Sequence, residues 1–113
     1  MSEPRLRTGI WVQALIWRCG QQGVAATVVR RGDGDAGAVL LKINRRGGVF
    51  TVLTQTRAPD GAPAWSRGIT GGEDEAAADA YIARQVKRDP DLWVIEIEDP
   101  AGERFLDGPI LGG

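Results

Sequence analysis

Apolar residues near the N-terminus follow a helical pattern. Thr8 can cap this helix, because its side-chain oxygen can accept a hydrogen bond from a backbone N–H of the first turn. Gly20 and Gly23 predict where the helix ends. Its apolar residues are Ile10, Trp11, Val12, Ala14, Leu15, Ile16, Trp17 and Cys19. They cover nearly every side, which predicts that the helix is largely buried.

The next part of the chain has the composition of strands separated by turns. β-branched residues over 24–30, a turn of Asp and Gly residues over 32–37, and a further apolar run over 38–44 predict a hairpin. A second turn at 45–48 leads into a strand over 49–55. We therefore expect these three strands to form an antiparallel meander.

A short strand and a second helix follow. The strand covers residues 64–69, and Thr70 with Glu73 then matches the S/T-x-x-E capping box that precedes many helices. The helix runs to about Arg88, since Pro90 disfavours a helical residue before it.

Two strands have consecutive apolar residues, at 39–41 and 93–95. Strict alternation is typical of a strand with one face in water, so consecutive apolar residues predict strands buried on both faces. Such strands need a helix on each side of the sheet. The sequence therefore predicts an α/β fold, a mostly antiparallel five-stranded sheet between two helices in the order α-β-β-β-β-α-β. We expect one globular domain over 6–107 and a flexible tail over 108–113.

Composition excludes several classes of function. The chain has 113 residues, 42% of them hydrophobic, and a net charge of -1, so no overall field draws it to nucleic acid or to an anionic membrane. Its longest apolar stretch is far shorter than the roughly 20 residues of a membrane span, and the N-terminus lacks the features of a signal peptide. We expect a cytoplasmic protein without a membrane or nucleic-acid partner.

The chemistry available to the chain is narrow. It contains no histidine and one cysteine, Cys19, which excludes catalytic pairs that use histidine, HExxH zinc sites and internal disulfides. Carboxylate, lysine, tyrosine or magnesium-assisted chemistry remains. No cofactor is predicted.

Three carboxylates end the last predicted strand. Glu96 and Glu98 share one face, about 6.6 Å apart by strand rise, with Asp99 on the other face. Such a cluster could hold Mg²⁺ in a phosphodiester or phosphate hydrolase. Alternatively, the glutamates are the solvated end of a strand paired with Lys42 across the sheet. Trp93, on the opposite face to the glutamates, is predicted to be a core residue.

A tryptophan outside any clear core pattern is a candidate interface residue. Trp65 follows a loop with two prolines and stands two residues before Arg67, and an exposed tryptophan beside an arginine is typical of interface hot spots. Alternatively, Trp65 covers the edge of the sheet.

Four segments together resemble a small proteobacterial family described as a domain of unknown function. They are residues 8–12, 30–33, 35–42 and 89–94, and the likeness extends from about residue 6 to residue 107. The resemblance implies no activity, cofactor or catalytic residue. With four tryptophans and no evident catalytic set, we expect a non-enzymatic binding or interaction module, either with a protein partner or as a homodimer. The alternative is the Mg²⁺-dependent hydrolase.

Overall fold

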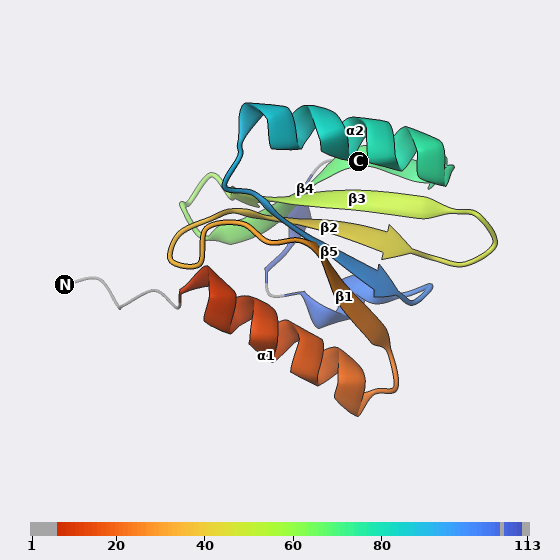
Figure 1. Ribbon diagram of the computed structural model, residues 1–113, viewed down its shortest axis with the longest axis horizontal. Coiled ribbons are helices and arrows are strands. Elements are labelled where there is room, and N and C mark those ends of the chain that lie inside the picture. The colour runs from red at the N-terminus through yellow and green to blue at the C-terminus, as the bar shows by residue number, and fades with distance from the viewer. Residues whose placement is uncertain (1–6, 107, 112–113) are drawn as a thin grey trace.

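Two helices enclose a mixed β-sheet in this protein (Figure 1). The computed structural model describes residues 7–106 and 108–111, with the backbone alone at residues 69–73, 102 and 103. Along these residues the elements are α1 (Thr8–Gln21), β1 (Ala25–Arg30), β2 (Val39–Asn44), β3 (Phe50–Arg57), β4 (Pro63–Glu73), α2 (Glu75–Arg88), β5 (Trp93–Glu98), the 3₁₀ helix η1 (Gly102–Phe105) and β6 (Ile110–Leu111). The predicted α/β class and the order of elements from α1 to β5 are confirmed.

The strands lie side by side in the order β1-β5-β2-β3-β4-β6. β2, β3 and β4 form an antiparallel meander, whereas β5 runs parallel to β2 and β6 runs parallel to β4. The prediction of a mostly antiparallel five-stranded sheet is therefore wrong, because the described residues form a six-stranded mixed sheet. The predicted hairpin between the first two strands is also wrong, since β5 lies between β1 and β2.

β5 takes a central position because it is apolar on both faces. Trp93, Ile95 and Ile97 join the hydrophobic core that includes buried residues of α1, and Val94 joins the separate core that includes Ala78 of α2. β2 is buried from its first residue to Ile43. β1 is mostly exposed and lies at the edge of the sheet. The predictions that β2 and β5 are central, and that the sheet lies between the two helices, are confirmed (Figure 1).

Backbone carbonyls, rather than a side chain, cap the start of α1. The N-cap residue is Arg7, which makes no side-chain cap, so the prediction that Thr8 caps the helix is wrong. The Thr8 N–H donates to the Asp35 carbonyl at 3.3 Å, and the Gly9 N–H donates to the Gly34 carbonyl at 2.9 Å. These bonds satisfy donors that have no partner within the helix.

The segment 32–37 therefore packs against its neighbours instead of closing a hairpin. The Thr8 hydroxyl donates to the Gly37 carbonyl at 2.8 Å. On the other side, the Asp33 N–H donates to the Asp91 carbonyl at 3.0 Å. The segment thus connects the start of α1 with the residues that lead into β5.

α2 begins later than the capping-box pattern predicts. β4 continues to Glu73, and Asp74 is the N-cap, accepting a hydrogen bond from the Ala77 N–H at 2.8 Å. The prediction of a cap at Thr70 is therefore wrong, because the backbone there is still extended. The side chains of Thr70 and Glu73 lie outside the described residues.

The end of the chain adds a strand that the sequence did not suggest. Ile110 and Leu111 pair with Trp65 and Ser66 of β4. Two residues of the tail predicted over 108–113 thus lie in this strand. No helix in the described ranges is long and apolar enough to cross a membrane.

Candidate functional site

The three strand-end carboxylates point to different surroundings. Glu96 faces α2 and lies 3.7 Å from the Lys42 ammonium, Glu98 is exposed, and Asp99 turns to Arg104. No group of three or more side chains arranged to hold a metal ion occurs in the part of the chain that the structure describes. The geometry thus gives no support to a shared magnesium site at Glu96, Glu98 and Asp99.

Three carboxylates surround the ammonium of Lys42. Its side chain is 6% exposed, and its ammonium lies 2.8 Å from both Glu75 and Asp79 of α2 and 3.7 Å from Glu96 of β5. It also lies 5.1 Å from the centre of the Phe50 ring. The predicted pairing of Lys42 with Glu96 is confirmed, and α2 supplies two closer partners.

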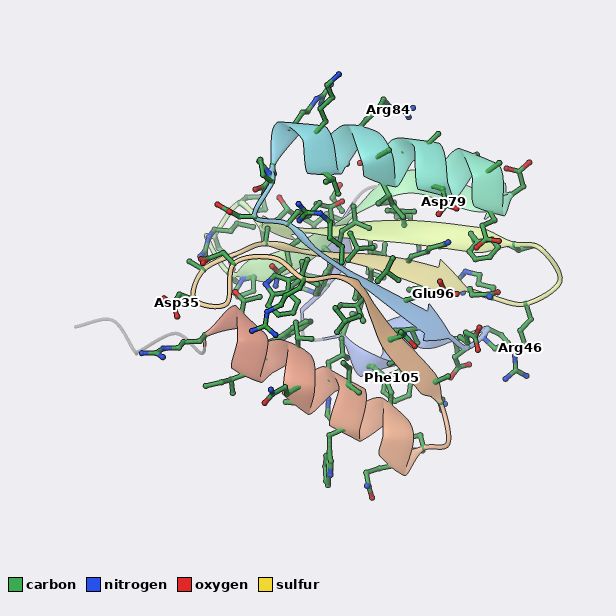
Figure 2. All side chains as sticks on the ribbon, in the orientation of Figure 1. Asp35, Arg46, Asp79, Arg84, Glu96 and Phe105 are labelled. Atoms are coloured by element: carbon green, nitrogen blue, oxygen red, sulfur yellow. The ribbon has the colours of Figure 1, made fainter. Side chains whose placement is uncertain are left out.

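The surroundings of Lys42 keep it charged. Burial is the largest single influence and lowers the pKa of the ammonium, but the hydrogen bonds to Asp79 and Glu75 and the charges of Asp79 and Glu96 together outweigh it, so the pKa is raised. A permanently charged amine is a poor nucleophile. Lys42 therefore serves to attach α2 to the sheet. Figure 2 shows two of its partners, Asp79 on α2 and Glu96 on β5.

Asp99 organises the turn after β5. Its carboxylate accepts a hydrogen bond from the Ala101 N–H at 3.0 Å and lies 2.7 Å from the Arg104 guanidinium. The Ala101 N–H lowers the pKa of Asp99 most, and the hydrogen bond and charge of Arg104 lower it as well, against the opposing effect of burial. Asp99 thereby holds Arg104, beside Phe105, near the C-terminal half of α1.

Trp65 is a core residue. It is 2% exposed, and its ring lies 5.9 Å from that of Trp11 at an angle of 34°. The expectation that Trp65 is exposed beside Arg67 as an interface residue is therefore wrong. Arg67 lies on β4 opposite Leu53 and is partly exposed.

The exposed tryptophan is Trp17, on the outer face of α1. Its exposed fraction is 65%, and that of Ile10, seven residues earlier on the same helix face, is 52%. The prediction that α1 is largely buried is therefore wrong on this side, because only Val12, Leu15 and Cys19 are fully buried. Burial also raises the pKa of the Cys19 thiol, so Cys19 is not an activated nucleophile.

Trp17 lies at the rim of a groove between α1 and the segment around η1. The groove encloses about 650 Å³, and its lining residues are Trp17, Arg18, Gln21, Gln22, Arg104, Phe105 and Leu106. An Arg18 Nη donates to the Phe105 carbonyl at 3.1 Å, and the Arg104 guanidinium lies 4.8 Å from the Phe105 ring centre. Figure 2 shows Phe105 on the α1 side of the sheet. We call these seven residues the α1 groove.

A second hollow of about 790 Å³ lies between α1 and the hairpin of β3 and β4. Two of its polar side chains, those of Thr8 and Gln55, already have partners within the fold. The Thr8 hydroxyl donates to the Gly37 carbonyl, and the Gln55 side-chain oxygen accepts from the Val39 N–H at 2.9 Å. The α1 groove, with the exposed Trp17, is therefore the stronger candidate for a binding site.

The fold and this surface define a small two-helix α/β domain with an exposed tryptophan and two arginines beside one groove. Its family model, described as "Protein of unknown function (DUF1491)", matches residues 6–107. The chain therefore belongs to the DUF1491 family, and the resemblance found from the sequence is confirmed. No curated protein matches the chain.

Solved structures of similar proteins have the same fold. A crystal structure of a DUF1491 family protein from Caulobacter crescentus CB15 has 42% identity, a TM-score of 0.84, and coverage of 95% of this chain and 100% of that chain. An NMR structure of a DUF1491 family protein from the same organism has 41% identity, a TM-score of 0.80, and coverage of 97% of this chain and 100% of that chain. A solution structure of a protein from A. tumefaciens has 25% identity, a TM-score of 0.78, and coverage of 91% of this chain and 93% of that chain.

Proposed function

We propose that this protein is a non-enzymatic binding module that holds a protein partner in the α1 groove. The observation that carries the proposal is the 65% exposure of Trp17 at the rim of this groove. Leaving an indole in water forgoes a large hydrophobic gain, and tryptophan and arginine are the residues most enriched at interface hot spots. Ile10 extends the apolar surface along the same helix.

The groove combines an apolar floor with positive charge. Phe105 is 9% exposed and lies beneath Arg104. The charged residues among the described lining are Arg18 and Arg104, and one N–H of Arg18 is committed to the Phe105 carbonyl. A guanidinium has five N–H donors, so Arg18 retains donors for a carboxylate.

These features favour a partner segment with both apolar and acidic side chains. The apolar side chain would cover Trp17 and Phe105, and a carboxylate would reach Arg18 at the rim. Opposite charge at a rim mainly speeds association and weakens with salt. Binding should therefore fall as salt rises, whereas the apolar contact with Trp17 should set most of the affinity.

The proposal is tested by capture with matched variants. Wild-type protein, Trp17→Ala, Arg18→Glu and Arg84→Ala are immobilised in equal amounts, exposed to extract of the native cells, and the captured proteins are identified by mass spectrometry. Arg84 lies on α2, across the sheet from α1 (Figure 2), and serves as the control. We expect the same protein to be captured by wild type and by Arg84→Ala but not by Trp17→Ala, with less captured by Arg18→Glu.

Circular dichroism of each variant must first match that of wild type. If folded Trp17→Ala captures the same proteins at wild-type levels, the α1 groove is not the binding site.

A further inference from the structure

β1 forms an open edge of the sheet. It ends the strand order of the described residues and pairs with β5 on one side. Val28 is 38% exposed and Val29 is 55% exposed. An edge strand presents backbone N–H and C=O groups that can pair with a further strand. The occupant best suited to this edge is therefore another extended chain segment.

This edge lacks most features that prevent strands from pairing. The five residues from 25 to 29 are uncharged and include no proline, whereas isolated edges usually carry lysine, proline or an inward-pointing charge. Arg30 turns its guanidinium to the Leu92 carbonyl at 2.7 Å. The shift of register between Val28 and Arg30 limits regular pairing to the first four residues of β1.

The two ends of this edge carry opposite charges. At the start of β1, Ala25 lies opposite Glu98 of β5, which is exposed. At its end, Arg30 is followed by the exposed Arg31. When two copies of β1 pair in antiparallel fashion, the arginine ends of the two copies lie far apart, at opposite ends of the paired strands. Parallel pairing would instead place the two arginine ends side by side.

We infer that β1 is a self-association edge, at which a second copy of this chain pairs in antiparallel fashion. The twofold axis stands perpendicular to the sheet near Thr27, so that the two sheets become continuous. In this register Thr27 of one copy lies opposite Thr27 of the other, and Ala26 lies opposite Val28. Each pair lies on one face of the sheet and is uncharged, and threonine pairs across strands stabilise sheets.

The central test measures the oligomeric state of the full chain. Sedimentation equilibrium over about 10 μM to 1 mM should show a reversible dimer, as a short interface of moderate affinity requires. Thr27→Lys places two ammonium groups opposite each other at the axis, and should raise the dissociation constant by about tenfold or more. Thr56→Lys alters an exposed threonine of β3, away from this edge, and should leave the dimer unchanged.

Three outcomes decide against the inference. A wild-type chain that is monomeric at 1 mM overturns the inference, and so does a Thr27→Lys variant that dimerises like wild type. If Trp17→Ala abolishes the dimer, the interface is the α1 groove and not β1.

Discussion

The indole N–H of Trp93 donates a hydrogen bond of 2.7 Å to the carbonyl oxygen of Asp33, 60 positions earlier in the chain. The ring is 3% exposed and packs in the core beneath α1, and the Arg31 guanidinium lies 5.4 Å from the ring centre. A single side chain thus joins the first residue of β5 to the segment that caps α1. The predicted core position of Trp93 is confirmed.

Replacing Trp93 should therefore cost more stability than replacing a surface residue. Trp93→Ala removes the packed ring and its hydrogen bond, and should lower the free energy of unfolding by about 3–5 kcal/mol. Trp93→Phe retains an aromatic ring but leaves the Asp33 carbonyl without the indole N–H, and should cost about 1–3 kcal/mol. Urea denaturation measures both, and a Trp93→Phe variant as stable as wild type would mean that the hydrogen bond contributes nothing.

The glycines beside Asp33 provide a matched pair of substitutions. A Cβ at Gly32 would lie 2.1 Å from the Asp91 carbonyl oxygen, whereas a Cβ at Gly34 would meet nothing within 4 Å. Gly32→Ala should destabilise the fold by roughly 1–3 kcal/mol or more, since the backbone must shift. Gly34→Ala should change stability by less than about 1 kcal/mol. Thermal melts that fail to separate the two variants would contradict the close approach of Gly32 to Asp91.

The position of β5 shows what sequence patterns can predict in this chain. Consecutive apolar residues in β2 and β5 correctly placed both strands in the interior, because burial on two faces is a local property of composition. The neighbour of β1 could not be predicted, since the turn-like residues 32–37 match a hairpin as well as a segment that packs against α1. The hydrogen bond that the Asp33 N–H donates to the Asp91 carbonyl, far along the chain, favours the second outcome.

The tryptophans show the same limit for the candidate site. Trp65 seemed exposed because its own strand is short of apolar neighbours, but its partner is Trp11 on α1. A helix that is apolar on all sides has more apolar surface than one face of a sheet can cover, so some of its apolar residues must be exposed. The pair Ile10 and Trp17, seven positions apart on one side of the helix, was therefore a candidate for the exposed side. Which side faces solvent depends on how the helix packs.

Lys42 offers a test of the link between α2 and the sheet. Lys42→Met replaces a nearly buried ammonium with an apolar side chain of similar length, and should change stability by no more than about 1–2 kcal/mol, since such replacements are often tolerated. The double variant Glu75→Gln/Asp79→Asn leaves the ammonium with Glu96 alone. It should cost about 2 kcal/mol, less than for a fully buried pair because both carboxylates are more than half exposed. Urea denaturation in which Lys42→Met is the more damaging change would contradict this.

The pH dependence of stability should report Asp99. Its pKa in the folded protein is lowered from 3.8, first by the Ala101 N–H and then by Arg104. As the pH falls, Asp99 therefore becomes protonated in the unfolded chain before it does in the folded protein. Its contribution to the free energy of unfolding is fully present above the unfolded pKa and is lost as the pH falls through the folded pKa. Asp99→Asn should reduce the acid-side decline of the melting temperature. Identical acid profiles for wild type and Asp99→Asn would contradict the role of Asp99.

Trp17 should dominate the solvent-accessible fluorescence of the protein. Its exposed fraction is 65%, whereas Trp65 and Trp93 are 2% and 3% exposed, and Trp11 is partly buried beside Trp65. Trp17→Phe should therefore remove most of the emission that acrylamide quenches, and should change the free energy of unfolding by no more than about 0.5 kcal/mol, as is usual for exposed positions. Trp11→Phe is the control and should leave the quenchable emission in place. If Trp17→Phe retains the wild-type quenching curve, Trp17 is covered in solution. Its indole is then not available to bind a partner at the α1 groove. Protection of Trp17 that appears only as the protein concentration rises would instead show that a second copy covers this face.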